Sequence, residues 1–205
     1  MRIFNVSLPL NDKTIIYPGN TNLEIKSLKS PSGNYLSEIN IGSHTGTHID
    51  APAHSIEGAS SIDQINLETF LGVCRVLDLT NSKKEILVED LKSKNIKGGE
   101  RVLFKTSNSL RGFEEFYDDY VYLSSNGAKY LSRLKVKLVG VDFLSIKQRG
   151  SKDNTPHTYL LSENIPIIEG LNLKDIEEGE YTLIAFPLAF TGIDGSPARA
   201  ILTKD

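Results

Sequence analysis

The sequence predicts one α/β domain, residues 1–205, with a mixed β-sheet core and short flanking helices. Eight short runs rich in β-branched and apolar residues, each bounded by turn residues, indicate strands. Four short segments of helical character lie between these runs. The continuous apolar run Leu138-Val-Gly-Val-Asp142-Phe is typical of a strand buried on both faces, which favours an α/β layer.

In chain order, the expected strands are residues 3–7, 23–28, 37–41, 72–79, 101–106, 135–143, 181–187 and 198–203. The expected helices are residues 66–71, 87–93, 125–134 and 157–163. The second and third helices follow polar starts, and the third opens Ser-Ser-Asn-Gly. No internal repeat or linker divides the chain, and 205 residues suffice for a core without disulfides. Metal is therefore not needed merely to hold the chain folded.

Composition excludes several classes of protein. The 23 basic and 26 acidic side chains are interspersed and give a net charge of −3, so no basic stripe is present for nucleic acid. No segment approaches the ~20 apolar residues of a membrane span, and the N-terminus lacks the apolar stretch of a signal peptide. We expect a cytoplasmic protein that binds neither nucleic acid nor membrane. The single cysteine, Cys74, lies in an expected strand and is interpreted as a small buried apolar residue.

Three of the four histidines, His44, His48 and His54, lie within eleven residues together with Asp50. Imidazole nitrogen and carboxylate oxygen are ligands that zinc and related divalent ions accept. The four positions share one parity and would project from the same face of an extended chain. Fully extended, they would span about 33 Å, so the chain must bend, and the segment contains a glycine and a proline that permit bending. The pattern indicates a metal site formed by a looped strand.

Two other interpretations of this segment remain. A helix would also bring histidines four residues apart together, but Thr45-Gly46-Thr47 is a poor helix core and the catalytic Glu of zinc-protease helices is missing. We reject that interpretation. The ordinary alternative is a set of hydrogen-bonded histidines in a turn-rich strand, which is less suited to three histidines and an aspartate in this arrangement.

The segment His44-Thr-Gly-Thr-His48-Ile-Asp50-Ala-Pro-Ala-His54 resembles the signature of the metal-dependent cyclase family, which includes bacterial kynurenine formamidases. The resemblance continues through residues 67–78 and 180–200. It covers nearly the whole chain and is least clear between about residues 80 and 135.

The resemblance implies that His54 is the catalytic acid/base. It also implies five metal ligands, namely His44, His48, Asp50, His157 and Glu169. The last two have the family's twelve-residue spacing between a His and a Glu. Considered alone, His157 would be interpreted as an ordinary surface residue. Glu169 lies in an apolar run, where a buried carboxylate must be paired or ligated.

We therefore expect a metal-dependent amidohydrolase that cleaves a small aryl formamide such as N-formylkynurenine, a reaction of tryptophan catabolism. One or two Zn²⁺ ions, or Mn²⁺, would lower the pKa of a water from ~15.7 toward ~7, and His54 would pass a proton to the leaving aryl amine. The family also contains isatin hydrolases, so lactam or ester hydrolysis is an alternative. A non-enzymatic binding module stabilised by metal is an alternative of another class. Because relatives are typically dimers or larger, we expect a homodimer or higher homo-oligomer.

One segment departs from the family pattern. Tyr17-Pro18-Gly19-Asn20 resembles the family's aromatic-Pro-Gly-Asp segment, with Asn20 in place of the usual acid. A Pro-Gly turn closed by Asn explains these residues by itself. At the other end, Asp194-Gly-Ser-Pro197 and Arg199 are interpreted as a turn that feeds a strand, without an assigned role. The candidates for an aromatic pocket wall are Tyr17, Tyr35, Phe186 and Phe190.

Overall fold

Seven of the eight strands of the main sheet close into a barrel in the computed structural model, which describes residues 1–205. The strands are β1 (Arg2–Asn5), β4 (His48–Asp50), β5 (Leu71–Asp78), β7 (Arg101–Lys105), β9 (Leu138–Val141), β10 (Ile167–Glu169), β11 (Gly179–Pro187) and β12 (Gly195–Lys204). Their order around the barrel is β12-β11-β5-β7-β9-β10-β4, and β4 pairs again with β12. The expected mixed sheet is present, and its closure is a more specific architecture than the sequence predicted.

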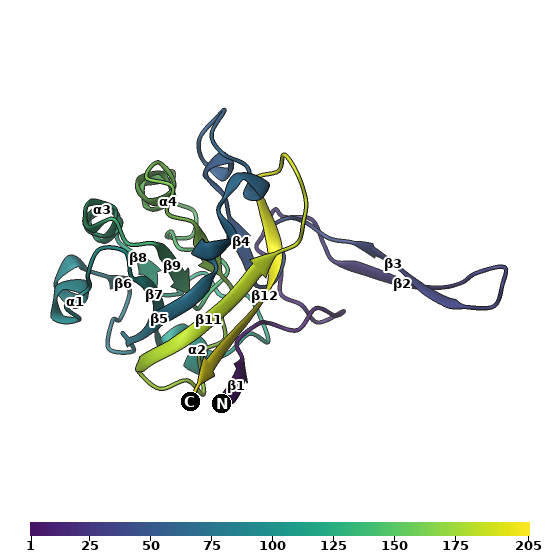
Figure 1. Ribbon diagram of the computed structural model, residues 1–205, viewed down its shortest axis with the longest axis horizontal. Coiled ribbons are helices and arrows are strands. Elements are labelled where there is room, and N and C mark those ends of the chain that lie inside the picture. The colour runs from purple at the N-terminus through teal and green to yellow at the C-terminus, as the bar shows by residue number, and fades with distance from the viewer.

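The barrel combines a parallel half with an antiparallel half. Strands β5, β7, β9 and β10 run parallel to one another, whereas β4, β11, β12 and the added strand β1 pair antiparallel. Helices α1 (Val88–Ser93), α3 (Ser125–Leu134) and α4 (Thr155–Leu161) lie beside the parallel half (Figure 1). This agrees with the rule that parallel strands need a covering layer on each face.

Helix α3 shows how local sequence sets these boundaries. The Ser124 hydroxyl accepts a hydrogen bond from the Gly127 N–H at 3.0 Å and caps the first turn. The helix ends at Lys135, which adopts a left-handed conformation with φ of 55°. Between these ends, Ala128 and Leu131 are buried in the layer between the helices and the sheet. The helix therefore has both its ends and its apolar face encoded locally.

Alternation along the strands divides the core into two regions. On β7, Leu103 belongs to the cluster that fills the barrel, together with Ile49 and Ile168. Its neighbours Val102 and Phe104 belong to the second cluster, which lies between the sheet and the helices. Successive strand residues point to opposite faces, so a residue next to an interior side chain lies on the outside of the barrel.

Several short elements differ from the expected ones. Residues 66–71 form a single 3-10 turn, η3 (Leu67–Thr69), because β5 begins directly after it. The structure adds α2 (Ser107–Arg111), β6 (Glu85–Ile86) and β8 (Tyr122–Leu123), together with β4 and β10. These segments have two to five residues, too few for periodicity to identify.

The hairpin of β2 (Glu24–Lys29) and β3 (Tyr35–Asn40), called the arm here, extends away from the barrel (Figure 1). The sequence predicted both strands but not their separation from the main sheet. Every residue of the two strands is exposed. In the observed register Ile25 lies opposite Ile39 and Leu28 opposite Leu36. These two apolar pairs face opposite sides of the hairpin because their positions differ in parity.

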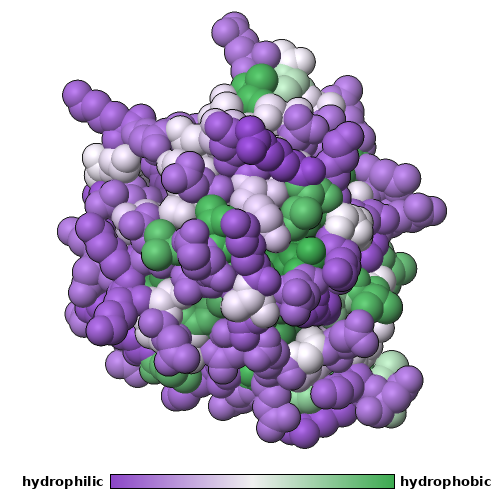
Figure 2. Space-filling model, turned by 90° about the vertical axis from the view of Figure 1, so that its left-hand side faces the viewer, coloured by the Kyte–Doolittle hydropathy of each residue, from purple (hydrophilic) through white to green (hydrophobic).

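The surface differs between the two halves of the barrel. The side that carries α1, α3 and α4 is mainly hydrophilic, with smaller apolar areas between the hydrophilic residues (Figure 2). Around β11 and β12, Ile3 on the neighbouring strand β1 and Val73 on the neighbouring strand β5 are 60% and 61% exposed. None of the helices combines the length and the apolar character that a membrane span requires.

Candidate metal centre

Strand β4 places two of the five predicted ligands on the outside of the barrel. His48 and Asp50 lie on one face of this three-residue strand, while Ile49 between them points into the barrel. The His48 Nδ1–H donates to the Gly46 carbonyl at 2.9 Å, which directs Nε2 the other way. His48 and Asp50 therefore project from one face of the strand, as their shared parity predicted. His44 and His54 instead arrive through the turns on either side of β4.

Strand β10 brings Glu169 next to His48. The two residues are opposite each other in the antiparallel pairing of β10 with β4. Glu169 is 3% exposed, and its Oε1 accepts the Ile146 N–H at 2.6 Å. The next residue, Gly170, has φ of 72°, and a Cβ there would clash with the Gly46 carbonyl oxygen. Glycine thus permits the close approach of the two segments that carry the ligands.

Helix α4 contributes the third side of the cluster. His157 is buried at 3% exposure, so its interpretation as an ordinary surface residue is wrong. Pro156 lies in the first turn of α4, where the missing N–H costs nothing and the fixed φ suits a helix start. His157 follows it and faces the barrel, because α4 packs against the strands that carry Asp50 and Glu169.

The Asp50 and Glu169 carboxylates lie between His48 and His157. Each carboxylate directs one oxygen toward His48 and the other toward His157. Asp50 places Oδ1 3.4 Å from His48 Nε2 and Oδ2 3.5 Å from His157 Nε2. Glu169 places Oε2 3.4 Å from His48 Nε2 and Oε1 3.3 Å from His157 Nε2. His44 Nδ1 is 2.8 Å from Asp50 Oδ1, on the His48 side. Four side chains thus form two adjacent positions, each with one oxygen from each carboxylate.

The charges of the cluster are strongly coupled. Burial by itself lowers the pKa of His48, but the Asp50 and Glu169 carboxylates outweigh burial and raise that pKa to about 10. The pKa of Asp50 lies well below its ordinary value, because nearby histidines outweigh the effect of burial. The pKa of Glu169 is lowered for the same reason. Both carboxylates are therefore ionised, and their buried negative charge needs a positive charge beside it. In the protein without metal, protonated histidine supplies that charge.

The donor set fits divalent metal. Two donors about 2.0–2.1 Å from a tetrahedral zinc ion stand about 3.3–3.4 Å apart. The four nitrogen–oxygen separations given above are 3.3–3.5 Å, which is longer than a usual charge-assisted hydrogen bond and close to the spacing of two zinc ligands. Asp50 Oδ2 is fully buried and has no hydrogen-bond partner, which is costly for a carboxylate oxygen unless a cation neutralises it. Nitrogen and oxygen donors with these spacings suit zinc or manganese.

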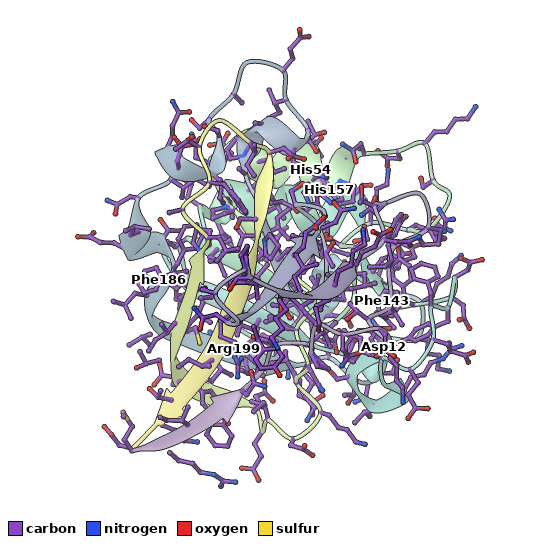
Figure 3. The ribbon with its side chains drawn as sticks, turned by 90° about the vertical axis from the view of Figure 1, so that its right-hand side faces the viewer. Asp12, His54, Phe143, His157, Phe186 and Arg199 are labelled. Carbon is purple, nitrogen blue, oxygen red and sulfur yellow. The ribbon has the colours of Figure 1, made fainter.

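His54 lies at the edge of this cluster. It follows Pro52 in the short turn η1 (Pro52–His54), and its side chain is 30% exposed, compared with 1% for His48. Its ring centroid is 5.3 Å from that of His157, and the two rings lie near each other in Figure 3. Burial, with the charges of His44 and His157, lowers the pKa of His54 despite the Asp50 carboxylate. His54 is therefore neutral at neutral pH and able to accept a proton.

A cavity of about 150 Å³ opens beside the cluster. Outside the cluster, its walls are formed by Tyr17, Asn20, Leu144, Ser145, Lys147 and Asn154. The Tyr17 ring is fixed by an edge-to-face contact with Phe116 and by the Arg149 guanidinium at 5.1 Å. The Asn20 N–H donates to the Tyr17 carbonyl at 3.0 Å, so the Pro-Gly turn forms as expected. A larger cavity, about 670 Å³ near Leu8 and Phe113, has none of the clustered histidines.

Of the four aromatic candidates for the pocket, the structure places only Tyr17 at this cavity. Tyr35 is 85% exposed on the arm. Phe186 and Phe190 line a separate apolar groove of about 420 Å³, and Phe186 lies well apart from His54 in Figure 3. Their positions depend on which strands pair, which the sequence pattern did not reveal.

Asp194 was missed as a site residue. It lies between β11 and β12, yet its Oδ2 is 2.7 Å from His44 Nε2 and 3.5 Å from His54 Nδ1. Its position next to Gly195 in a turn gave no indication of this contact, because it is 150 positions from His44 in the chain. The contact forms because β12 pairs with β4 and closes the barrel.

Fold and site together define a barrel protein with a histidine–carboxylate centre for divalent metal on its outer face. Comparisons with known proteins agree with this class. The cyclase family model ("Putative cyclase") matches residues 4–148. The kynurenine formamidase of Bacillus cytotoxicus is 35% identical over 97% of this chain and 95% of its own. The chain belongs to the cyclase family, as the histidine motif predicted.

Solved structures show the same relationship. A predicted metal-dependent hydrolase from Bacillus stearothermophilus is 33% identical and superposes with a TM-score of 0.88, covering 98% of this chain and 97% of that one. Isatin hydrolase A from Ralstonia solanacearum is 25% identical with a TM-score of 0.82, covering 99% and 92%. Proteins with this fold therefore include one described as a predicted metal-dependent hydrolase and one described as an isatin hydrolase.

Proposed function

We propose that this protein is a metal-dependent amidohydrolase that cleaves a small aryl formamide, with N-formylkynurenine as the leading candidate substrate. The observation that carries the proposal is the division of the Asp50 and Glu169 oxygens between His48 and His157 at 3.3–3.5 Å. This arrangement suits two ions that share both carboxylates. The similarity to kynurenine formamidases over nearly the whole chain supports the choice of substrate.

Zn²⁺ is the metal we propose, with Mn²⁺ as the alternative. His44, His48, Asp50 and Glu169 would hold one ion, and Asp50, Glu169 and His157 the other. When bound, such ions act as Lewis acids and lower the pKa of a coordinated water from ~15.7 toward ~7. The second ion would have three protein ligands, one fewer than the first, which would leave a coordination position open for water or substrate. Catalytic zinc sites have such an open position, whereas structural sites do not.

His54 is the proposed acid/base. Its lowered pKa leaves the ring neutral, so it can accept a proton during attack on the formamide carbonyl. The same nitrogen then returns the proton to the leaving aryl amine, so one residue serves both steps. Its 30% exposed side chain places it at the cavity, where a substrate can reach it, whereas His48 and His157 are buried.

Two cavity residues fit the proposed substrate. The fixed Tyr17 ring offers a flat apolar wall to an aryl group. Lys147 is the lysine that lines the cavity, and we propose that its ammonium binds a carboxylate on the substrate. A neutral substrate such as isatin would not use that contact.

The test is a hydrolysis screen of metal-stripped protein reloaded with Zn²⁺, Mn²⁺ or Mg²⁺, using N-formylkynurenine, simple aryl formamides and isatin. We expect metal-dependent release of formate from the formamides, with two equivalents of bound metal by elemental analysis. Circular dichroism of the stripped protein controls for unfolding. Hydrolysis of isatin alone would favour the lactam reaction of the isatin hydrolases. No hydrolysis of any substrate by folded, metal-loaded protein would refute the enzyme and favour a structural metal.

We also propose that the protein is a homodimer or larger homo-oligomer in which the arm contacts a second copy. An isolated two-stranded hairpin is at best marginally stable in water. The arm exposes apolar pairs on both faces, and the same chain offers an uncovered apolar face at Ile3 and Val73. The two ends of the arm continue into the cavity residue Asn20 and the ligand His44, so contact at the arm would also steady the site.

Sedimentation or light scattering tests this association. Ile39→Glu on the arm is expected to shift the protein toward monomer, because a charge would be buried in the contact. Leu110→Glu is the matched control, since Leu110 is also exposed, at 54%, but lies on α2. A wild-type monomer at working concentration, or equal effects of the two variants, would contradict the proposal.

A further inference from the structure

The Asp194 carboxylate contacts two histidines of the centre through one oxygen. Oδ2 lies 2.7 Å from His44 Nε2 and 3.5 Å from His54 Nδ1. The two rings also lie close together, with centroids 4.1 Å apart. Asp194 therefore lies beside both a proposed ligand and the proposed acid/base, although it is itself 43% exposed on the side chain.

The two nitrogens of His44 face different carboxylates. Nδ1 points to Asp50 Oδ1 at 2.8 Å, and Nε2 points to Asp194 Oδ2 at 2.7 Å. A nitrogen that ligates metal must carry no proton, so the remaining proton of a neutral imidazole belongs to the other nitrogen. With metal on the Asp50 side, Nε2–H donates to Asp194. A carboxylate in this position fixes the tautomer and the orientation of a ligating histidine and increases its basicity.

The fold holds Asp194 in place independently of the histidines. Its carbonyl accepts the Ala51 N–H at 2.9 Å, which ties the loop to the end of β4. The following residue, Gly195, lies opposite Asp50 in the pairing of β12 with β4. A Cβ at Gly195 would stand 2.6 Å from the Ile49 carbonyl oxygen and 2.9 Å from His44 Cε1. The absence of a side chain here allows the loop to bring Asp194 up to His44.

We propose that Asp194 is a positioning residue that orients His44 for metal binding and His54 for proton transfer. Its carboxylate accepts the His44 Nε2–H and leaves Nδ1 directed at the metal position. The same oxygen attracts His54 Nδ1, which leaves the other ring nitrogen to face the substrate. A ring nitrogen of His54 also lies within 4.8 Å of donor atoms of Asp50 and His157, so the ring bridges Asp194 and the centre. The inference rests on the proposed metal centre.

Metal affinity is the first test, because it requires no substrate. Chelator competition with Zn²⁺ is expected to show weaker binding in the order wild type, Asp194→Asn, Asp194→Ala, with the alanine variant about 10–100-fold weaker than wild type. The amide oxygen of Asn can still accept the Nε2–H, so that variant is expected to recover part of the affinity. Asp63→Asn is the matched control, because Asp63 Oδ1 accepts the Gly192 N–H of the same loop without contacting a histidine.

Two further readouts separate this role from others. At saturating metal, Asp194→Ala is expected to lower kcat more than it raises KM, because His54 is misoriented while the cavity is intact. In metal-free protein, ¹⁵N NMR of the imidazoles is expected to show changed His44 and His54 resonances in Asp194→Asn but not in Asp63→Asn. This measurement stands even if the proposed hydrolysis fails.

Specific outcomes would overturn the inference. Wild-type Zn²⁺ affinity and kcat in folded Asp194→Ala would exclude a positioning role. Loss of one whole equivalent of metal in that variant would make Asp194 a ligand instead, with His44 and His54 as its partners. Unchanged imidazole resonances in Asp194→Asn would show that the contact does not exist in solution, whatever the protein hydrolyses.

Discussion

Replacing His54 and His48 separately by alanine distinguishes an acid/base from a ligand. His54→Ala is expected to lower kcat about 10²–10⁴-fold, the usual contribution of a general acid/base. That factor corresponds to about 2.7–5.4 kcal/mol of transition-state stabilisation. The ring of His54 has one polar contact in the structure, the 3.5 Å approach of Nδ1 to the half-exposed Asp194 carboxylate, and is itself 30% exposed, so we expect a stability loss below about 1 kcal/mol and unchanged metal content.

His48→Ala is expected to behave differently. The ring is 1% exposed, and its removal takes away the imidazolium that lies 3.4 Å from both the Asp50 and the Glu169 carboxylate. Breaking a buried ion pair in this way costs about 3–5 kcal/mol. Urea unfolding of metal-free protein measures that loss, and elemental analysis measures the loss of bound metal. Added imidazole is expected to restore turnover in part to His54→Ala only. Loss of metal from His54→Ala, or wild-type turnover in it, would refute the assignment.

Three other substitutions or modifications test further details. Gly195→Ala is expected to destabilise the protein by about 1–3 kcal/mol, because its Cβ would stand 2.6 Å from the Ile49 carbonyl oxygen; a wild-type urea midpoint would contradict this. Burial raises the pKa of Cys74 to about 12, so a thiol reagent at mildly alkaline pH is expected to modify Cys74 only after the protein unfolds. Fast modification of the native protein would contradict this. Lys147→Met is expected to raise KM for substrates with a carboxylate but not for neutral aryl formamides, and equal effects on both would exclude the proposed contact.

The local sequence was most informative where several chemical groups lie within one short segment. His44, His48, Asp50 and His54 are close in the chain, so their clustering was visible without knowing any strand pairing. The family motif, which the comparisons confirm, also led to His157 through its spacing. The helix at 125–134 was predicted with its exact bounds, because its cap and its apolar face are both local.

The sequence was less informative about elements that exist only through long-range pairing. Strands β4 and β10 have three residues each and are stabilised by neighbours far along the chain. Because β4 completes the ring, its omission also hid the closure of the barrel. The arm shows the opposite case, since its strands were predicted correctly but their periodicity could not reveal that they leave the main sheet.

Residue types and their spacing along the chain specify which donors are available, so the chemistry of the centre could be predicted from the sequence. How those donors are used depends on contacts that form only when the chain folds. Pairing of β10 and β12 with β4 places Glu169 and Asp194 on opposite sides of the histidine segment. Packing of α4 buries His157 against the same carboxylates. Contacts between residues more than a hundred positions apart arise from the closure of the barrel, and no local pattern records that closure.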